Sequence, residues 1–590
     1  MRPVSWPVGQ QLTGHLRNLS LFVVVVIGIA AAIGVARRSG RPLPIAPPGG
    51  PPSRGGSLVA SVHTDPRTFN RLLARDSTSD LVATLTQARL VRINRVTGDV
   101  EPWLAASWTR AADGLRYTLT LRPNVTFSDG HPFTSDDVLF SFEALYDDKV
   151  ASVLADSLTA GGKKLQVTAP DPLTVVVSFP EPFAPGVRIL DNLPILPRHA
   201  LGAHLQAGTF TRAWALDTPV RHIVGLGPFV VSAYVPGERL VFDRNPRYWR
   251  RDTNGAALPY LDRVTIEIIP DQNVELLRLD AGQIDMTATE MRPEDYAPLA
   301  RGAAAGRLKI LDLGAGFEAD SLWFNLKPGG LATSDARAPW LQHDALRRAI
   351  SMAVDRQLFA DTVFLGAGVP VFGPITSANT HWYADLPAVG HNPARARAEL
   401  ASIGLTDRNG DGLLEDTRGQ AARFTLITQA GNTALERGAK VISDELKNIG
   451  LTADVVTLEG NALVQRFLSG QYDAVYFRVA ATDTDPASNP DFWFSAGSAH
   501  VWNIGQTTPA TDWERRIDEL MRQQIASFDE GERKRLFDEV QKIFAAHLPT
   551  LQFVAPRVRV AVSARVTNLT PSAFSRPQLL WAPDAIAVAH

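Results

Sequence analysis

Residues 112–145 read ADGLRYTLTLRPNVTFSDGHPFTSDDVLFSFEAL and combine the signals of a strand region with those of a helix. Residues 115–127 alternate apolar and polar side chains with a period of two, which predicts a strand pair with one buried face. Gly114 and Gly130 each follow an aspartate, and Asp-Gly pairs supply the positive φ that a hairpin turn requires. The two acids after Ser135 favour the start of an amphipathic helix, because they interact well with the positive end of the helix dipole.

Helices and strands alternate through the rest of the chain. Two apolar runs at residues 423–430 and 451–458 flank a helical pattern at about 434–449, which favours a right-handed β-α-β crossover and parallel strands. Long helices are also expected at residues 344–364 and 512–546. The predicted fold class is therefore α/β, with mixed β-sheets flanked by helices.

The composition is that of a globular protein without a preference for polyanions. The 590 residues include 45% apolar and 20% charged side chains, enough for more than one hydrophobic core. The formal net charge is -2 and charges of both signs are mixed along the chain, so we expect no nucleic-acid partner. There is no cysteine, which excludes disulfides, thiolate metal sites and a lipid-modified cysteine near the N-terminus.

An uncharged apolar stretch near the N-terminus points to export. Residues 19–36 have arginines on both sides and are slightly shorter than the roughly 20 residues that span a bilayer. Gly34 and Ala36 provide the small-residue pattern of a cleavage site, whereas the arginines that follow favour an uncleaved anchor. We expect residues 1–38 to be a signal peptide or a membrane anchor, with the folded body in the periplasm or on the outer face of the cytoplasmic membrane.

Residues 39–56 read SGRPLPIAPPGGPPSRGG. Proline and glycine dominate this segment, which therefore cannot form a helix or the centre of a sheet. We interpret it as a flexible linker between the membrane segment and the folded body.

Motifs of several enzyme classes are missing from the sequence. It contains no HExxH, no GxSxG and no GxxxxGK[ST], so a zinc hydrolase, a nucleophile elbow and a phosphate-binding loop are not expected. We predict no catalytic residues, no cofactor and no enzymatic activity. Because the chain lacks a phosphate-binding loop, any nucleotide hydrolysis that drives transport must take place on another polypeptide.

One acidic turn is similar to the start of a calcium-binding loop. Asp407, Asn409 and Asp411 place oxygen atoms at alternate positions before a glycine, a pattern that suits Ca²⁺. The twelfth position, however, is Arg418 and not a bidentate acid. We interpret the segment as an acidic turn and predict no metal site, with a weak calcium site as the alternative.

A set of segments in a fixed order resembles the bacterial extracellular solute-binding proteins of family 5, which include the dipeptide- and oligopeptide-binding proteins of ABC importers. The longest matches are residues 104–145, 346–368 and 533–553. Shorter matches are DPRTFN at 65–70, LPILPRHAL at 193–201, VGLGPFVV at 224–231, RNPRYW at 244–249, LDAGQIDM at 279–286, LWFNLKP at 322–328 and IGLTDRNGDGLLED at 403–416. The resemblance covers the chain from residue 57 onward, and the missing lipid-attachment cysteine affects only the expected mode of tethering.

The resemblance implies a two-lobed periplasmic-binding-protein fold (type II, cluster C-like) with an extra inserted subdomain. The expected segments are lobe I at 57–102, the inserted subdomain at 103–215, lobe I again at 216–310, lobe II at 311–555 and a return to lobe I at 556–590. It further implies a monomer that closes over a peptide and delivers it to an ABC permease, with a separate ATPase. A nickel chelate, an oligosaccharide or haem is the alternative cargo, and a membrane-tethered solute sensor without transport is the alternative role.

Residues 480–494, AATDTDPASNPDFWF, are the best candidate for the ligand site. In the family, an acidic residue of the corresponding loop pairs with the amino terminus of the peptide. Asp485 fits this role best and Asp483 is the alternative, although either acid could instead cap a turn. The aromatic residues Phe492, Trp493 and Trp502 are candidates for the walls of side-chain pockets, and core packing explains them equally well.

Overall fold

The computed structural model describes residues 52–74, 76–288, 290–328, 337–478, 483–574 and 579–589. These residues belong to one compact unit, residues 47–590. The predicted signal peptide or anchor at residues 1–38 and most of the predicted linker lie outside the described residues. Within the described ranges, no helix combines the length and the apolar character that crossing a membrane requires.

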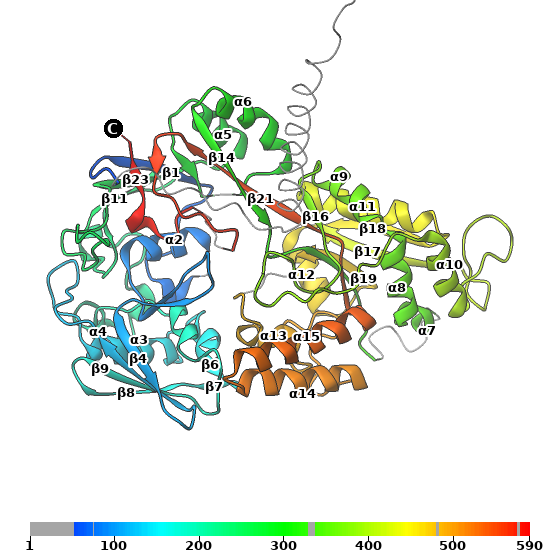
Figure 1. Cartoon of the computed structure of the whole chain (residues 1–590), viewed down its shortest axis with the longest axis horizontal. Helices are drawn as coiled ribbons and strands as arrows, with labels where there is room; N and C mark the ends of the chain where they lie inside the picture. Colours follow the sequence, from blue (N-terminus) through cyan, green and yellow to red (C-terminus); the bar gives the residue numbers. More distant parts are fainter. Residues whose placement is uncertain are drawn as a thin grey trace, which may run out of the picture. The chain divides into compact units, whose positions relative to one another are not determined.

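The largest sheet has eight strands from widely separated parts of the chain. In spatial order they are β10 (Phe229–Val235), β11 (Arg239–Arg244), β12 (Arg263–Ile268), β1 (Ser57–Val62), β13 (Met286–Thr287), β21 (Val554–Ser563) and β14 (Leu308–Ala315), with β16 (Gly368–Pro370) paired to β21. Strand β1 is parallel to β12 and β13, and the other pairs are antiparallel. We call the body around this mixed sheet the first lobe (Figure 1).

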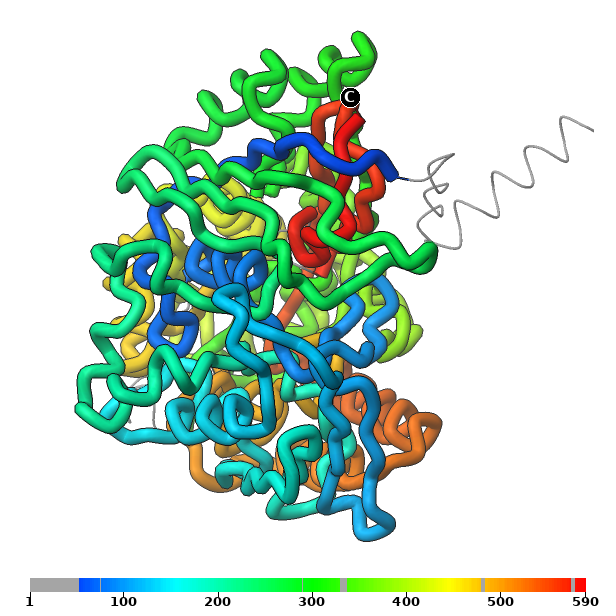
Figure 2. Tube along the Cα trace, turned by 90° about the vertical axis from the view of Figure 1, so that its left-hand side faces the viewer, coloured from blue at the N-terminus to red at the C-terminus, as the bar shows by residue number. Residues whose placement is uncertain are grey.

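Helices α2 (Ser77–Thr86), α5 (Gln272–Asp280) and α6 (Tyr296–Ala304) pack against the first-lobe sheet, and α9 (Arg356–Val363) contacts its strands β16 and β21. The two ends of the described chain meet in this lobe. Figure 2 shows the first strand, in blue, beside the C-terminal residues, in red. Arg565 donates a hydrogen bond from Nη2 to the carbonyl of Ser57 at 2.9 Å, and β22 (Val566–Thr567) pairs with β23 (Ala587–Val588).

A separate four-stranded antiparallel sheet lies at the lower left of Figure 1. Its order is β4 (Ala105–Arg110), β5 (Arg116–Leu121), β9 (Thr174–Ser178) and β8 (Gln166–Asp171). Helix α3 (Ser135–Tyr146) packs on β8 and β9, and α4 (Arg198–Gln206) packs on α3. We use the name inserted subdomain for the body that extends from β4 to α4, residues 105–206.

The start of α3 is where the sequence predicts it. Thr134 is the N-cap, and its side chain accepts a hydrogen bond from the amide of Asp136. The carboxylate of Asp137 accepts one from the amide of Thr134 in return, at 3.0 Å. This reciprocal capping box satisfies amide groups that would have no partner inside the helix.

The strand pair predicted within residues 115–127 is wrong in its second half. Strand β5 ends at Leu121 and pairs with β4 and β9. Pro123 has no amide hydrogen to donate to a sheet, and Asn124 adopts the left-handed region with φ 59°. Beyond this break the chain forms only an isolated antiparallel bridge between Thr126 and Pro132, across the turn that contains Gly130.

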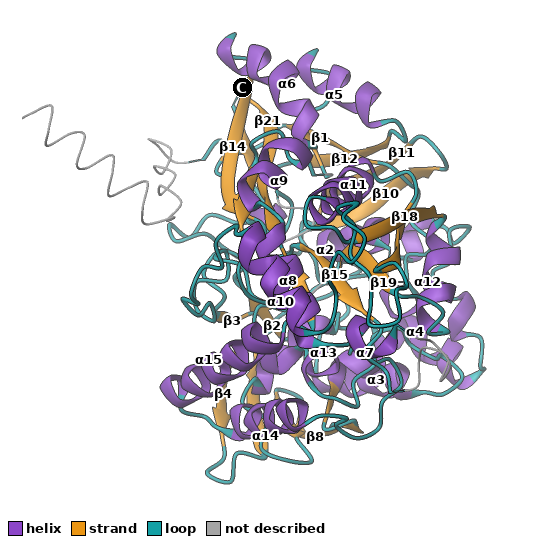
Figure 3. Ribbon diagram, turned by 90° about the vertical axis from the view of Figure 1, so that its right-hand side faces the viewer, coloured by secondary structure: helices purple, strands orange, loops and turns teal. Residues whose placement is uncertain are grey.

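The sheet of the second lobe has five strands. Their order is β18 (Thr452–Leu458), β17 (Arg423–Gln429), β19 (Ala474–Arg478), β15 (Asp320–Phe324) and β20 (Thr550–Gln552). Helix α11 (Thr433–Lys447) connects the parallel strands β17 and β18, which confirms the predicted β-α-β unit. Figure 3 shows α8 (Asp344–Ala353) and α10 (Pro393–Ser402) in front of this sheet and α12 (Gly460–Leu468) at its far edge.

Two helices that the apolar periodicity predicts as continuous are each broken by an aspartate. The first divides into α8 (Asp344–Ala353) and α9 (Arg356–Val363), and the second into α14 (Asp512–Ala526) and α15 (Glu530–His547). Asp355 and Asp529 are the N-caps of the second helix in each pair, and their carboxylates accept hydrogen bonds from amides of its first turn. Aspartate competes in this way with the helical backbone, so it ends one helix and begins the next.

The remaining helices and strands are short or peripheral. They include α7 (Ala338–Leu341), α10 (Pro393–Ser402), α13 (Pro490–Trp493), the pairs β2 (Val91–Ile93) with β3 (Val100–Pro102) and β6 (Thr159–Ala160) with β7 (Lys163–Lys164), and the 3-10 helices η3 (Gly186–Asn192) and η7 (Pro486–Ser488).

Two segments cross from the first lobe to the second. One leads from β14 to β15, and the other leads back from β20 into the long strand β21 (Figure 1). They lie side by side, because the amide of Gly316 donates to the carbonyl of Pro556 at 2.7 Å. We call residues 316–319 and 552–558 the crossing segments.

Candidate functional site

A cavity of about 530 Å³ lies between the two lobes, inside the range of about 300–1,000 Å³ that is usual for ligand pockets. The first lobe contributes residues of α2 and the C-terminal segment before residue 575. The second lobe contributes residues 374–376 and 379 and residues 483, 484, 486 and 488–493, and both crossing segments also line the cavity. A guest molecule held there would therefore contact both lobes and the segments that join them.

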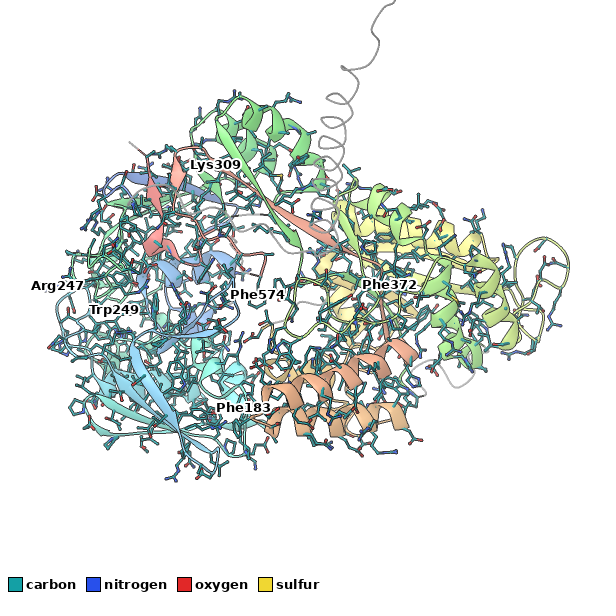
Figure 4. The ribbon with its side chains drawn as sticks, in the orientation of Figure 1. Phe183, Arg247, Trp249, Lys309, Phe372 and Phe574 are labelled. Atoms are coloured by element: carbon teal, nitrogen blue, oxygen red, sulfur yellow. The ribbon has the colours of Figure 1, made fainter. Side chains whose placement is uncertain are left out.

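Two phenylalanines that are far apart in the chain form an aromatic part of the wall. Phe317 lies on the first crossing segment, and its ring centroid is 5.1 Å from that of Phe574. Figure 4 labels Phe574 at the edge of the first lobe that faces the second. The guanidinium of Arg95, another lining residue, lies 5.3 Å from the Phe574 ring centroid. The cavity thus offers apolar surface beside charged groups.

Arg478 carries a positive charge on the second-lobe side of the cavity. Its Nε donates to Oδ1 of Asp320 at 2.8 Å, and Asp320 is only 2% exposed. Burial lowers the pKa of Arg478, but the attraction and hydrogen bond of Asp320 outweigh burial and raise it, and Glu290 and Glu318 add to the effect. The guanidinium therefore remains charged.

Asp485, the first sequence candidate for the ligand's amino group, does not line the cavity. It is 6% exposed, and its Oδ1 accepts a hydrogen bond from Nη2 of Arg533 at 2.7 Å. The same oxygen accepts from the amide of Ala487 at 2.9 Å, so Asp485 is the N-cap of η7. Asp485 therefore occupies the position expected from the alternative interpretation, in which its carboxylate caps a turn.

Asp483, the second candidate, lines the cavity but is already paired. Nε and Nη2 of Arg188 donate to its two carboxylate oxygens at 2.8 and 2.6 Å. Nη2 also donates to Oγ1 of Thr484 at 3.0 Å. Arg188 belongs to η3 of the inserted subdomain, so this bidentate ion pair joins that subdomain to the second lobe.

A second contact between the same bodies lies nearby. The amide of Ala184 donates to the carbonyl of Ile525 at the end of α14, at 2.7 Å. Figure 4 labels the neighbouring Phe183 where the inserted subdomain meets α14 and α15. The guanidinium of Arg110 lies 3.7 Å from the ring centroid of Phe528, between these two helices. The inserted subdomain therefore contacts the second lobe at the cavity wall and beyond it.

The aromatic candidates divide between the cavity and the core. Phe492 and Trp493 line the cavity, although Trp493 is 4% exposed and packs on Phe537 with ring centroids 5.0 Å apart. Trp502 does not line it. Its ring is buried in the core, and its Nε1 donates to Oε1 of Glu514 at 3.2 Å. Core packing therefore accounts for Trp502.

Glu514 organises the polar contacts around Trp502. Its Oε1 faces Nε2 of His500 at 3.1 Å, and its Oε2 accepts from the amide of Thr511 at 2.9 Å, in the capping box of α14. Burial alone raises the pKa of Glu514, but the hydrogen bonds and charge of His500, with those of Trp502 and Thr511, lower it below the usual value.

This lowered pKa predicts a loss of stability in acid. A carboxyl group whose pKa is lower in the folded state stabilises the fold above its unfolded pKa of about 4.3, and the contribution disappears as the pH falls through the lowered value. The free energy of unfolding should therefore fall more steeply between pH 6 and pH 3 in the wild type than in Glu514→Gln. Urea titrations at both pH values measure it.

Glu519→Gln is the matched control, because Glu519 is exposed on the same helix. It should keep the wild-type slope with pH. Equal slopes in all three proteins would contradict the role assigned to Glu514.

Sequence reasoning missed several residues that line the cavity or pair with its wall. Arg188 meets Asp483 only through the fold, because 295 positions separate them. Phe317, Arg478 and Phe574 have no distinguishing local pattern. Asp491 lies inside the candidate segment, in the first turn of the short helix α13.

In the acidic turn at residues 407–412, side-chain oxygens accept hydrogen bonds from backbone amides of the same turn. Asp407 accepts hydrogen bonds from the amides of Gly410 and Gly412 at 2.7 and 3.0 Å. Asn409 Oδ1 accepts from the amide of Asp411 at 2.9 Å. In the described ranges, no three or more histidine, aspartate and glutamate side chains converge as a metal site would require. The weak calcium site remains an untested alternative.

Comparison with known proteins identifies the family. The family model for bacterial extracellular solute-binding proteins, family 5, matches residues 99–500. The chain belongs to this family. A probable ABC transporter-binding protein of Deinococcus radiodurans is 27% identical over 89% of this chain and 90% of its own length. The oligopeptide-binding protein AppA of Bacillus subtilis is 27% identical over 78% of this chain and 79% of its own length.

Solved structures share the two-lobed fold of this solute-binding protein. NikA from Brucella suis, in complex with Fe(III)-EDTA, superposes with a TM-score of 0.74 at 20% identity and covers 90% of this chain and all of its own. AppA from Bacillus subtilis, in complex with a nonapeptide, has a TM-score of 0.67 at 24% identity and covers 92% and 100%. The predicted class, a two-lobed periplasmic-binding-protein fold with mixed sheets flanked by helices, is confirmed.

Proposed function

We propose that this ABC-transporter solute-binding protein captures short peptides between its lobes and delivers them to a membrane permease. The observation that carries the proposal is the composition of the interlobe cavity, in which the aromatic pair Phe317 and Phe574 lies beside charged groups of both signs. A peptide combines apolar side chains with a positive amino terminus and a negative carboxyl terminus. Such a guest can contact both the aromatic pair and the charged groups of each sign in this wall.

The arrangement supports capture and release without chemical conversion of the cargo. When two lobes close over a guest, water leaves the cavity and each remaining polar contact becomes stronger. Release then needs only that the lobes separate, a hinge motion that the two crossing segments allow. We also propose that residues 19–36 carry or hold the protein at the outer face of the cytoplasmic membrane, where a permease can receive the cargo.

The relatives support a peptide and also define the competing cargo. AppA, named for oligopeptides, is 27% identical to this chain. NikA shares the fold and was solved with Fe(III)-EDTA, so a metal chelate is the competitor to test. Fold alone does not decide between them, because the same fold carries many ligand sites.

Calorimetric titration of the purified protein tests the peptide. A mixed pool of di- to pentapeptides should bind with a dissociation constant of about 1 µM or lower, equivalent to about -8 kcal/mol. Fe(III)-EDTA, a nickel chelate and an oligosaccharide serve as controls. Binding of one of these controls, with no heat from any peptide, would replace the peptide as cargo.

A further inference from the structure

We propose that Thr376 and Asn379 are positioning residues that couple the crossing segments to the closure of the lobes. Both residues line the interlobe cavity and are buried, with exposed fractions of 3% and 8%. They act through the ion pair of Arg188 with Asp483, which joins the inserted subdomain to the second lobe. The inference goes beyond the proposed function, because it concerns how closure is controlled and holds for any cargo captured between the lobes.

Thr376 links the wall segment, as we call residues 374–379, to both crossing segments. Its Oγ1 donates a hydrogen bond to the carbonyl of Gly316 at 2.7 Å. The amide of Gly316 donates in turn to the carbonyl of Pro556 at 2.7 Å. A bend of the crossing segments at this point must therefore either move Thr376 or break its hydrogen bond.

Asn379 links the wall segment to the loop that carries the interlobe ion pair. Its Nδ2 donates to the carbonyl of Thr484 at 2.8 Å. The amide of Asn379 donates to the carbonyl of Thr376 at 3.1 Å and closes a turn between the two residues. Its own carbonyl accepts hydrogen bonds from the amides of Trp382 and Tyr383 at 3.2 and 2.9 Å. The backbone at Asn379 is therefore fixed on both sides of the residue.

The residues that follow the wall segment anchor it to α15. Gln541 is 1% exposed, and its Nε2 donates to the carbonyl of Trp382 at 2.8 Å. Its Oε1 accepts from the amide of Ala384 at 3.2 Å. The ring of Trp382 packs on that of Phe537, with centroids 5.9 Å apart. The wall segment is therefore held to the second lobe as a stiff link between its two positioning residues.

The hydrogen-bonded link ends at the acceptors of Arg188. Nη2 of Arg188 donates both to Oγ1 of Thr484 and to the carboxylate of Asp483, at 3.0 and 2.6 Å. On the other side, Nη1 of Arg188 donates to the carbonyl of Gly98 at 2.5 Å. The guanidinium is thus held by Gly98 and its acceptors by Asn379. Closure loses less entropy when both partners are placed before they meet.

The link affects the balance between the closed and the open arrangement of the lobes. Without the hydrogen bond of Asn379, the backbone at Thr484 must be ordered each time Arg188 engages it, so the closed arrangement becomes less populated. Loss of the Thr376 hydrogen bond has the same effect, because it releases the other end of the wall segment from the crossing segments. The apparent dissociation constant of any cargo then rises as the closed fraction falls.

A distance measurement on the full chain tests the coupling. The chain contains no cysteine, so two introduced cysteines take spin labels at defined positions. Asp148→Cys places one label on the inserted subdomain and Asp512→Cys places the other at the start of α14, where the native side chains are 100% and 94% exposed. Double electron–electron resonance gives the ratio of closed to open molecules, first without ligand and then with the mixed pool of di- to pentapeptides.

Matched variants isolate the two hydrogen bonds of the link. Thr376→Val removes the hydroxyl at nearly constant volume, whereas Thr376→Ser keeps it. Asn379→Leu removes the donor of the second hydrogen bond at similar volume. Thr428→Val is the control, because Thr428 is 0% exposed and its Oγ1 donates to the carbonyl of Tyr476 at 2.8 Å inside the second-lobe sheet. Thermal unfolding should show similar losses of stability in Thr376→Val and Thr428→Val.

Thr376→Val and Asn379→Leu should each lower the closed-to-open ratio about twofold to tenfold, the effect expected from one hydrogen bond. Thr376→Ser and Thr428→Val should keep the wild-type ratio. Neither Thr376→Val nor Asn379→Leu should lower the ratio further when combined with Arg188→Gln, because the link acts through Arg188. Full additivity in the combined variants, or a wild-type ratio in both single variants, would overturn the inference.

The measurement also separates this inference from the proposed cargo. Ratios that shift as expected without ligand, but do not respond to the peptide pool, would keep the coupling and remove the peptide. A peptide pool that closes the wild type, Thr376→Val and Asn379→Leu from the same starting ratio and to the same extent would keep the peptide and remove the coupling. Identical ratios in every protein with no response to peptides would overturn both proposals.

Discussion

Asp485→Ala is expected to lower the free energy of unfolding by about 3–5 kcal/mol, which is the usual cost of removing one partner from a buried ion pair. The guanidinium of Arg533 would remain without a carboxylate at a position that is 8% exposed. The amide of Ala487 would lose its acceptor too. The effect belongs to stability and not to recognition, because Asp485 lies outside the cavity wall. Urea denaturation followed by fluorescence measures it.

A double variant controls for the general cost of changing this region. Arg533→Met keeps most of the volume of the arginine, which packs over the ring of Trp382 with a guanidinium-to-centroid distance of 4.8 Å. Asp485→Ala combined with Arg533→Met removes both charges and should be more stable than Asp485→Ala alone. A double variant no more stable than the single one would show that the unpaired guanidinium is not the cause. Peptide affinity at a temperature where both variants remain folded should match the wild type.

Arg188→Gln is expected to shift the lobes toward an open arrangement and to weaken cargo binding about tenfold or more. The bidentate pair of Arg188 with Asp483 can form only when the inserted subdomain and the second lobe are close together. Loss of one partner from a buried charged pair costs about 2–5 kcal/mol. That cost is paid only in the closed arrangement, so the closed population falls and the apparent dissociation constant rises by the same factor.

Small-angle scattering and calorimetry together measure this shift. The radius of gyration of Arg188→Gln should exceed that of the wild type, and saturating cargo should reduce the difference. Arg198→Gln is the matched control, since Arg198 lies on α4 of the same subdomain and pairs with the exposed Asp136. If Arg188→Gln and Arg198→Gln scatter identically and bind with equal affinity, the pair does not hold the lobes together. An exchange of the two charges, Arg188→Asp with Asp483→Arg, should recover part of the closure.

The two predictions reassign the acids of one short loop. The chemistry of this segment is visible in the sequence, because three aspartates and several aromatic residues occur within residues 483–494. Their separate roles are not visible there. Asp485 is neutralised by Arg533 on α15, Asp483 by Arg188 in another subdomain, and Asp491 by neither. An aspartate can cap a turn, join two bodies or meet a ligand, and the choice depends on which cation the fold brings to it.

The two helices that were predicted as continuous are wrong for a related reason, because the role of an aspartate again depends on its surroundings. Apolar periodicity continues across residues 344–364 and 512–546 because one face of each segment is buried along its whole length. Asp355 and Asp529 nonetheless end the continuous helices, since each carboxylate binds amides of the following turn. The N-cap signal was present in the sequence, but a periodic pattern alone does not decide whether an aspartate lies within a helix or begins one.

The sequence by itself determined the class of this protein: an α/β chain of family 5, with its turns, its crossover helix and the start of α3 encoded by residues close together in the chain. Such features depend on backbone preferences and on periodic burial, which neighbouring residues express locally. Only the tertiary structure decided which charges remain available to a guest. Charge compensation acts through space, and Arg188 and Asp483 are 295 positions apart in the chain yet 2.6 Å apart in the fold.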